Sequence, residues 1–510
     1  TTRLRDRPLR SVGRSCTRLS LRLTGPVTVA IAFAVPLVVL LASVRTSVGY
    51  WDTGDLQTVA WIAGIPYPTG FPGYVLIGWL WTHLLPFASV AARLNALSAV
   101  AVASGAATVA AIALLLDVLP AVAILAGTTF AFANVVWLRG TYADVHPLGF
   151  AVAFAAVALA VRWALRGDAR ALATGTVLAG AAVAIDNTTV LILLGGVVAT
   201  LARRWPALVV VRAVAVAVLI VAAAYAYLPL RSAYVTAHRA DPTLALGIPP
   251  GRPFWDDHHP STREGFRSLV AGTEWGPGET LAVLFTPAVM RRAFDRFGGA
   301  FSADEPQGLP VAGLIGMGFI VAQAPLVGLG LVLAAIVPAL FGAAYPAEAD
   351  PERYVLALYA VTALGVAVAA DRTVKAFGGR RPAVALGVVC ALLAVVCVRD
   401  VVRGRELFAF RTNPEASELG TRVAKGTRDG SVVVAPWDWA TSLAYGAYVE
   451  RRLGTRIVVC ALPREHLDEY AAWMRARQVT IVSEGAPDLP GYRTRKLTDG
   501  SPQVYEILAP

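Results

Sequence analysis

Charged residues are scarce in this chain: they make up 15% of its 510 positions, whereas hydrophobic residues make up 56%. A soluble protein normally carries about 25% charged residues. The hydrophobic residues also come in long runs instead of the amphipathic repeats that cover a soluble core. The composition therefore excludes an ordinary soluble protein and predicts a multi-pass α-helical protein of the cell membrane, in contact with membrane lipids.

Signatures of several other protein classes are missing as well. The four cysteines, Cys16, Cys390, Cys397 and Cys460, have neither the spacing of a metal site nor that of a disulfide framework. No small-residue cleavage site follows the first hydrophobic stretch, which favours a retained helix over a secretory signal. The C-terminal region has no glycine-rich phosphate loop. We therefore expect no metal, no nucleotide and no other cofactor.

The positive charge of the chain is interpreted together with this composition. A formal net charge of +11 would suggest nucleic-acid binding in a soluble protein. Here the basic residues lie in short clusters between hydrophobic runs, where they determine the orientation of membrane helices. We therefore expect no nucleic-acid partner.

Hydrophobic runs near the thickness of the bilayer's hydrocarbon layer predict about eleven transmembrane helices. A further stretch at 71–87 is shorter and contains Pro72 and Pro86, so we expect it to lie at the membrane interface or to re-enter. The predicted spans are 26–44, 92–116, 119–138, 146–164, 171–185, 188–202, 207–229, 309–325, 326–343, 354–370 and 382–398.

Basic residues predict which ends of these helices face the cytoplasm. Residues 1–25 contain seven arginines and one acidic residue, so we expect this segment to be cytoplasmic. If 71–87 does not span, the basic turns at 162–170, 203–204 and 375–381 all lie on the same side, as the positive-inside bias requires. Counting 71–87 as a span would place these turns outside. Eleven spans therefore fit better than twelve.

The same orientation divides the chain into three parts. The cytoplasmic N-terminus (1–25) precedes a transmembrane domain (26–400) whose loops 45–91 and 231–308 lie outside, and residues 401–510 form an extracytoplasmic domain. Short hydrophobic runs alternate with helical patterns in this last part, which predicts a small α/β domain. The expected strands are 431–436, 456–460 and 479–482, and the expected helices are 440–452 and 464–478.

The first outer loop contains two carboxylates three residues apart, Asp52 and Asp55. If a helix begins here, both share one face of it. Asp52 could simply cap such a helix. Alternatively, one of the two acts as a general base or orients an acceptor just above the bilayer, where proximity to lipid raises a carboxyl pKa and favours proton transfer.

This loop also resembles a known family. Residues 52–56 read DTGDL, residues 64–65 read GI, and residues 68–74 read PTGFPGY. This pattern is similar to that of DUF2723-type membrane glycosyltransferases, which include transmembrane O-mannosyltransferases within the GT-C superfamily. The resemblance implies a GT-C-like fold, a polyprenyl-phosphate-linked sugar donor, an inverting transfer and an acidic base, here Asp52 or Asp55. It also implies substrate contacts from this loop, for which we name Tyr67 and Tyr74.

The chain departs from the family pattern at two places. Tyr67 stands where the family often has His, and residues 186–189 read DNTT where the family often has a turn like Asn-His-His-Thr. These changes leave the identity of the donor and acceptor open but retain the carboxylates. Asp186 and Asn187 remain candidates for substrate binding, and a role of Asp186 in capping a turn competes with that.

Other candidates lie at predicted outer helix ends. Asp144 and His146 are candidate substrate ligands, although solvation at the interface would also make their charges inexpensive. Arg231 and Arg353 could bind a donor phosphate or only anchor helix ends at the membrane. The segment 350–354 (DPERY) resembles a turn of the related enzymes, which favours Arg353 together with Tyr354.

Two further groups are interpreted more simply. His258 and His259, beside Asp256 and Asp257, are adjacent in sequence and lack a third ligand at metal spacing, so we expect a solvated loop. Three outer tryptophans could stack on sugar rings, but packing and interface anchoring explain them equally well. These are Trp275, Trp437 and Trp439.

Together these patterns favour an integral membrane glycosyltransferase. It would move a sugar, with mannose suggested by the resemblance, from a polyprenyl-phosphate donor to a hydroxyl of a protein, lipid or glycan acceptor on the extracytoplasmic side. The alternatives are a transporter or lipid flippase, or a non-catalytic membrane assembly protein. A transporter predicts internal repeats and charges buried within its spans, whereas here the spans carry few charges and no repeat is evident.

Overall fold

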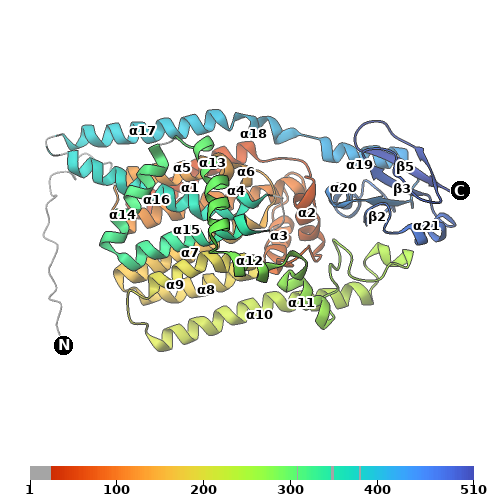
Figure 1. The fold of residues 1–510 in the computed structure, drawn as a ribbon, viewed down its shortest axis with the longest axis horizontal. Helices are drawn as coiled ribbons and strands as arrows, with labels where there is room; N and C mark the ends of the chain where they lie inside the picture. Colours follow the sequence, from red (N-terminus) through yellow and green to blue (C-terminus); the bar gives the residue numbers. More distant parts are fainter. Residues whose placement is uncertain (1–23, 307, 346–349, 378, 380, 510) are drawn as a thin grey trace.

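The structure is a computed structural model that describes residues 24–306, 308–345, 350–377, 379 and 381–509. Most of the predicted N-terminal segment 1–25 lies outside the described residues. An elongated bundle of helices forms one part of the molecule, and a small sheet domain lies beyond one end of it (Figure 1). The predicted fold class is therefore confirmed.

Each of the eleven predicted spans contains an apolar helix. Seven helices are long and apolar enough to cross a membrane, and the described part also contains four shorter ones, α5, α8, α9 and α14. The bounds are α1 Gly25–Ser43, α4 Val90–Leu115, α5 Pro120–Phe132, α7 Val145–Arg166, α8 Ala169–Ile185, α9 Val190–Thr200, α10 Ala207–Ala237, α14 Gly308–Gln323, α15 Pro325–Ala344, α16 Leu356–Phe377 and α17 Pro382–Arg403.

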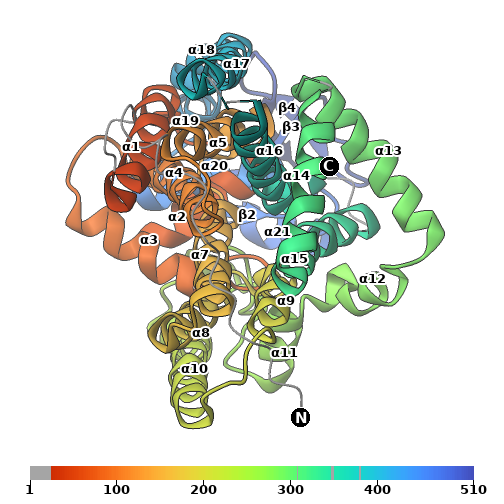
Figure 2. The same cartoon turned by 90° about the vertical axis from the view of Figure 1, so that its left-hand side faces the viewer.

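Several of these boundaries differ from the prediction; α16 and α17, for example, continue to Phe377 and Arg403, past the expected ends at 370 and 398. The helix expected over 119–138 breaks at Ala133, and α6 (Asn134–Arg139) follows as a separate short helix. Helix α10 continues to Ala237, past the expected end at 229, because the hydrophobic run ends at that point while the helical hydrogen bonding does not. Hydrophobicity thus marks the apolar part of a helix and not its whole length. Figure 2 shows α10 at the periphery of the bundle.

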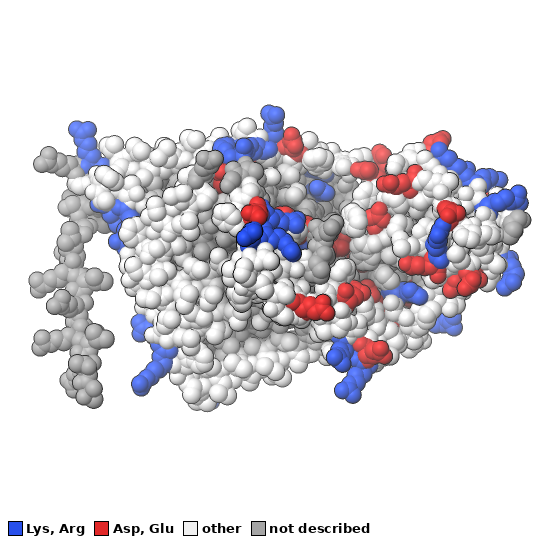
Figure 3. Space-filling view, viewed as in Figure 1, with Lys and Arg blue, Asp and Glu red and all other residues white. Residues whose placement is uncertain are grey.

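Charge is distributed as expected for a membrane protein. Figure 3 shows a wide band of the helical part with almost no charged side chains, with Lys and Arg at its far end. Charged residues of both signs cover the part that contains the sheet domain. This pattern agrees with a hydrocarbon layer around the bundle.

Glycines let the bundle helices approach each other closely. A Cβ added to Gly316 of α14 would lie 1.7 Å from the carbonyl oxygen of Gly365 in α16. Likewise, a Cβ on Gly195 of α9 would lie 2.1 Å from the carbonyl oxygen of Gly330 in α15. Close backbone contact at small residues holds membrane helices together where lipid is as apolar as the side chains.

The segment 45–91, named the first outer loop after its predicted location, forms two helices, α2 (Trp51–Ile62) and α3 (Pro72–Leu84). Helix α3 has 13 residues, which is about 20 Å of helix, too short for the roughly 30 Å hydrocarbon core. Its large apolar side chains are nevertheless exposed, as expected for a helix in the membrane interface. These exposed residues are Leu76, Ile77, Trp79, Leu80 and Leu84.

The second outer loop consists of short helical elements. They are η3 (Pro242–Leu246), α11 (Arg263–Ala271), η4 (Thr273–Trp275), α12 (Pro277–Val283) and α13 (Pro287–Asp304). Several irregular turns separate them, and four positions between 247 and 276 are glycines in the left-handed region. This loop therefore has a defined path between the bundle and the C-terminal domain.

Beyond α17, the chain enters the α/β domain through α18 (Arg405–Ala409), η6 (Phe410–Thr412) and α19 (Glu415–Gly426). Its five strands have the order β2-β1-β3-β5-β4, with β1, β2 and β3 parallel and β4 and β5 antiparallel. The strands are β1 Val432–Ala435, β2 Ile457–Cys460, β3 Val479–Ser483, β4 Arg493–Lys496 and β5 Gln503–Leu508; α20 (Trp437–Ala444), η7 (Tyr445–Val449) and α21 (Leu467–Met474) lie between the first three.

The three expected strands and both expected helices are confirmed, but β4 and β5 were missed. Strand β4 reads RTRK and is mostly exposed at the sheet edge, so it has no hydrophobic pattern. Charged residues at an edge strand discourage pairing with other chains. Glu506 of β5 is buried in the sheet and pairs with Arg495 of β4, which interrupts the hydrophobic run of β5.

The α/β domain packs directly on the first outer loop. A Cβ on Gly54 of α2 would lie 2.9 Å from Oγ1 of Thr441 in α20, so the two helices touch. The hydroxyl of Tyr445 accepts a hydrogen bond from the backbone N–H of Ala91 at 2.9 Å. These contacts position the start of α2 between the bundle and the domain.

The glycine contact between α14 and α16 gives a test of the packing. Gly316→Ala should destabilise the protein by about 1–3 kcal/mol, because its methyl group would overlap the backbone of α16. Gly318→Ala on the same helix is the control, since no atom lies within 4 Å of its added Cβ. Thermal unfolding in detergent measures both. Equal melting temperatures for the two variants would contradict the close helix contact.

Candidate active site

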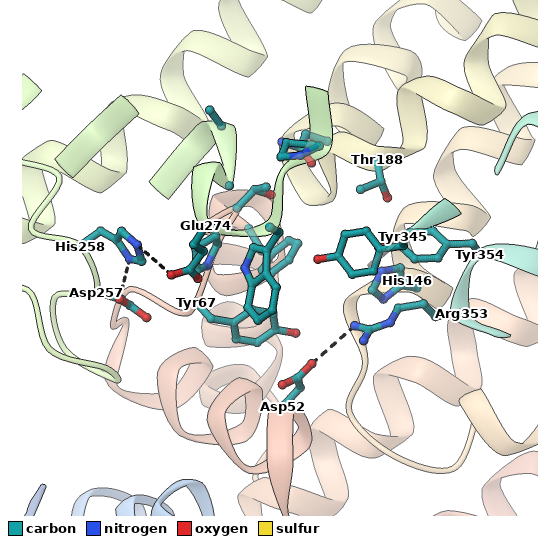
Figure 4. Close-up of a pocket in the computed structure, with 18 of the residues that line it drawn as sticks. Asp52, Tyr67, His146, Thr188, Asp257, His258, Glu274, Tyr345, Arg353 and Tyr354 are labelled. Carbon is teal, nitrogen blue, oxygen red and sulfur yellow. Dashed lines mark hydrogen bonds and ion pairs between the residues drawn. The ribbon is translucent and has the colours of Figure 1, made fainter. Parts of the chain in front are cut away.

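A cavity of about 440 Å³ lies where the bundle, both outer loops and the α/β domain meet. Its volume is in the range of small-molecule sites. All of its lining residues come from segments that the sequence places on the outer side or at the outer ends of spans. They are Trp51, Asp52, Tyr67, Pro68, Thr69, Phe71, His146, Asn187, Thr188, Pro253, Asp257, His258, Ala271, Gly272, Glu274, Trp275, Pro277, Phe341, Tyr345, Arg353, Tyr354 and Trp437 (Figure 4).

Asp52 lies in the wall of this cavity, in the first turn of α2. Its Oδ1 accepts a hydrogen bond from Nε1 of Trp437 at 3.1 Å, and its Oδ2 lies 3.5 Å from Nη1 of Arg353. The carboxylate is 38% exposed. The alternative that Asp52 caps the helix is wrong, because Tyr50 occupies the N-cap position and no side chain caps this end.

Asp55 lies one turn further along α2 and does not line the cavity. Its side chain is fully buried, and neither carboxyl oxygen forms a hydrogen bond of ordinary geometry within the described part of the chain. Burial raises the pKa of Asp55 well above its usual value, and the charges of Asp257 and Asp52 raise it further. The protonated, neutral form is therefore favoured, and Asp55 is poorly suited to accept a proton from a substrate.

Arg353 and Tyr354 enter the cavity from η5 (Pro351–Val355), the turn before α16. The guanidinium is mostly buried beside Asp52, and its Nε donates to the carbonyl oxygen of Asp350 at 3.0 Å. The ring of Tyr354 contacts His146 edge-on, with 5.4 Å between the ring centroids. A cation and an aromatic group thus lie next to the carboxylate of Asp52.

His146 is held by a buried charge network at the start of α7. Asp144 caps this helix by accepting from the backbone N–H of His146 at 2.9 Å, and it also contacts His146 Nδ1 at 2.8 Å. Arg139 contacts Asp144 at 3.2 Å and also pairs with Asp350. Although burial opposes ionisation of Asp144, its contacts with His146 and Arg139 lower its pKa below the usual value. The expectation of interface solvation for these residues is wrong, since the structure buries them.

The turn at 186–189 places Asn187 and Thr188 in the cavity wall. Asp186 is buried behind them, where it accepts from the backbone N–H of Thr188 at 2.9 Å and from its hydroxyl at 2.8 Å. The side chain of Asn187 donates to the carbonyl oxygen of Val270 at 3.3 Å. Asp186 therefore shapes this wall as a capping residue.

The remaining predicted residues divide between the cavity and its surroundings. Tyr67 lines the cavity against Phe71 and Trp437. Tyr74 and Arg231 are not among the lining residues. Tyr74 is buried in an apolar cluster, and Arg231 donates to the carbonyl oxygen of Ile62 at 3.0 Å. For these two, the predicted contact with substrate finds no support in the geometry.

Residues 256–259 were expected to form a solvated loop. This expectation is wrong, because the segment supplies part of the cavity wall. Asp256 and Asp257 are buried, and His258 lines the cavity together with Asp257 and Glu274. His258 Nδ1 lies 2.8 Å from Asp257, and its Nε2 lies 3.5 Å from Glu274. Hydrogen bonding to Asp257 and then to Glu274 raises the pKa of His258 to about 10. The run of two aspartates and two histidines was the available signal.

Aromatic residues complete the walls. Trp51 and Tyr345 were not placed in a site by the sequence, whereas Trp275 and Trp437 were considered for sugar stacking and both line the cavity. The part of the chain that the structure describes contains no cluster of three or more His, Cys, Asp or Glu residues arranged for a metal ion. The cavity thus combines a proton acceptor, a cation for an anionic group and aromatic surfaces for a ring.

Comparison with known proteins agrees with this fold. Residues 52–209 match the family described as the N-terminal domain of the protein O-mannosyl-transferase TMEM260. The crystal structure of apo ArnT from Cupriavidus metallidurans has a TM-score of 0.60 at 14% identity, over 94% of this chain and 97% of that chain. ArnT from the same organism bound to undecaprenyl phosphate gives 0.57 at 13% identity, with the same coverage. The family match agrees with the resemblance to transmembrane O-mannosyltransferases over residues 52–209, and the similarity to ArnT confirms the expected fold.

The buried state of Asp55 predicts an effect on stability that depends on pH. Its pKa in the folded protein lies above the value of about 3.9 expected for an unfolded chain. The unfolded state therefore ionises first, and the folded protein loses stability as pH rises above that value, until pH passes the folded pKa. Asp55→Asn removes this loss.

Thermal unfolding from pH 4 to pH 8 checks the prediction. The melting temperature of Asp55→Asn should match that of the wild type near pH 4 and exceed it increasingly toward pH 8. The exposed Asp468 serves as the control, and Asp468→Asn should show no such trend. A loss of stability in Asp55→Asn that grows with pH would mean that the carboxylate is charged in the fold.

Proposed function

We propose that this chain is an integral membrane glycosyltransferase that transfers a sugar from a polyprenyl-phosphate donor to an acceptor hydroxyl on the extracytoplasmic side. The observation that carries the proposal is the meeting of Asp52 and Arg353, 3.5 Å apart, in one cavity at the end of a membrane bundle. The match to the O-mannosyl-transferase family over residues 52–209 supports it. We propose mannose as the sugar on the same ground.

Arg353 is the proposed ligand of the donor phosphate. A guanidinium can bind two phosphate oxygens at once, and such charge-assisted hydrogen bonds are stronger than neutral ones. Arg353 lies in η5, directly before α16, at the level of the cavity that residues of both outer loops line. A phosphate on a membrane-embedded polyprenyl chain would lie at this level. A protein of similar fold, ArnT, has been crystallised with undecaprenyl phosphate.

Asp52 is the proposed general base. The acceptor hydroxyl oxygen attacks the anomeric carbon and forms the new glycosidic bond, while its proton passes to Asp52. The bond between the anomeric carbon and the phosphate oxygen breaks, and polyprenyl phosphate leaves with the electron pair beside Arg353. Attack opposite the leaving group inverts the anomeric configuration. The Trp437 N–H fixes the orientation of Asp52 during this step.

The ion pair between these residues gives the reaction an order. Arg353 contacts Asp52 directly, with 3.5 Å between its Nη1 and Oδ2 of Asp52. A donor phosphate that binds Arg353 competes with Asp52 for the guanidinium. Donor binding would therefore release the Asp52 carboxylate to accept a hydrogen bond from the acceptor hydroxyl.

Sugar transfer in isolated membranes tests the function. Wild-type membranes should release sugar from one member of a panel of radiolabelled polyprenyl-phosphate sugars in the presence of acceptor. Asp52→Asn should lower the rate by about 10²–10⁴-fold, the usual contribution of a general base. Arg353→Lys keeps the charge but loses the two-point contact, and should chiefly weaken donor binding.

Asp55→Asn is the matched control, because it changes the neighbouring carboxylate while that group is buried away from the cavity. It should retain most of the activity. Wild-type rates in Asp52→Asn would rule out Asp52 as the base. If wild-type membranes turn over no donor in the panel, transport or a scaffolding role becomes the better explanation.

The proposed side of the reaction has its own test. In a background without the native cysteines, Ser261→Cys of the second outer loop should react with a membrane-impermeant maleimide in intact cells. Arg204→Cys, in a basic turn expected to be cytoplasmic, should react only after permeabilisation. The reverse labelling pattern would place the cavity in the cytoplasm and contradict the proposal.

A further inference from the structure

The cavity has two chemically different ends. Figure 4 shows Arg353, Tyr354 and His146 on one side of the drawn residues, and Asp257, His258 and Glu274 on the other, with Tyr67 and Asp52 between them. The first side offers a cation for a phosphate. The second side offers two carboxylates with an imidazole between them. The mechanism proposed above uses only the first side and Asp52.

The local backbone presents this second cluster to the cavity. Glu274 and Trp275 lie on the single turn η4 (Thr273–Trp275), which is bracketed by the left-handed glycines Gly272 (φ 58°) and Gly276 (φ 57°). His258 itself has a left-handed backbone conformation (φ 61°), which residues other than glycine rarely adopt. Such conformations are kept where the surroundings determine them, often at functional sites.

The contacts of His258 limit what the cluster can do. Both ring nitrogens face carboxylates, Nδ1 toward Asp257 and Nε2 toward Glu274. The ring is therefore held as an imidazolium and is available neither as a metal ligand nor as a base. With two carboxylates and one imidazolium, the cluster keeps an excess of hydrogen-bond acceptors. Carboxylate oxygens accept more than one hydrogen bond, and hydroxyl groups are suitable donors.

An aromatic surface adjoins this cluster. Trp275, next to Glu274 in sequence, also lines the cavity, and its ring lies 6.4 Å from that of Tyr345 between centroids. Rings of this kind provide apolar faces for the C–H groups of a sugar. The carboxylates of Asp257 and Glu274 can accept hydrogen bonds from hydroxyl groups, and the adjoining face of Trp275 can pack on a ring. Together they suit a sugar ring that carries hydroxyl groups.

We propose that the carboxylates of Asp257 and Glu274, held by His258, recognise hydroxyl groups of the transferred sugar that are remote from its anomeric carbon. The proposal rests on the proposed function. If the phosphate binds Arg353 and the anomeric carbon lies near Asp52, the rest of the sugar extends toward the opposite end of the same cavity. His258, whose ring nitrogens face Asp257 and Glu274, acts there as the positioning residue for both carboxylates.

Donor discrimination tests this assignment. The probes are the polyprenyl-phosphate sugar that the wild type turns over best, its monodeoxy analogues and the corresponding amino sugar. A site built to bind a substrate hydroxyl rejects the analogue without it by up to about 10⁴-fold. Glu274→Gln should lower kcat/KM for the parent donor at least tenfold while changing that for one deoxy analogue little, so that discrimination at that hydroxyl falls. His258→Gln should affect the same hydroxyl.

Two controls separate recognition from folding. Glu279→Gln changes an exposed carboxylate in the same loop, outside the cavity, and should keep wild-type discrimination. Binding of sugar-free polyprenyl phosphate should be unchanged in Glu274→Gln and His258→Gln, because that ligand contacts only the Arg353 end.

Three results would overturn the inference. Glu274→Gln could lower kcat/KM equally for all donors, which would show that Glu274 recognises no hydroxyl group of the sugar. If the same variant also lost binding of sugar-free polyprenyl phosphate, the cluster would serve only to stabilise the fold of the second outer loop. A wild-type preference for the amino sugar would mean that the carboxylates select a cation. Absence of any donor turnover in the wild type is a different result, which counts against the proposed function itself.

Discussion

The contact between Asp52 and Arg353 is the interaction on which the arrangement of this protein depends. It joins residues 301 positions apart, one from the first outer loop and one from the turn before α16. Trp437 of the α/β domain donates a hydrogen bond to the same carboxylate. The helix bundle, the outer loops and the sheet domain must all be in place before these three side chains can meet. A folded membrane part with a displaced C-terminal domain would lose one of the two partners of Asp52.

The buried charges in the wall near Arg353 are paired with one another. Arg139 lies between Asp144 and Asp350, and Asp144 in turn holds His146. A buried charge without a partner is costly, whereas a hydrogen-bonded set can keep its members ionised. This network therefore fixes the wall near Arg353 before substrate arrives. Asp55 differs from this network: among the residues that the structure describes, its carboxyl has no charged hydrogen-bond partner, and burial favours the neutral form.

The sequence was informative about the fold because hydrophobic runs and the DTGDL segment are local signals. All eleven expected spans contain helices, and Asp52, Tyr67, His146, Asn187, Arg353 and Tyr354 do meet at one cavity. Spacing could not decide between Asp52 and Asp55, because both lie on one side of α2 and the burial of Asp55 depends on distant segments that pack around this helix. The His258 cluster was missed for the same reason: its burial depends on contacts between distant segments. Strand β4 carried no signal, since exposed charged residues form it.

The measurement that tests this account most directly is a structure of the protein with its polyprenyl-phosphate sugar donor bound, for example by electron cryomicroscopy of the Asp52→Asn variant, in which turnover is slowed. The account predicts the phosphate against the guanidinium of Arg353 and the anomeric carbon facing residue 52. It also predicts the sugar ring toward the His258 side of the cavity. A donor phosphate bound elsewhere, with Arg353 still directed at residue 52 and the cavity unoccupied, would contradict it.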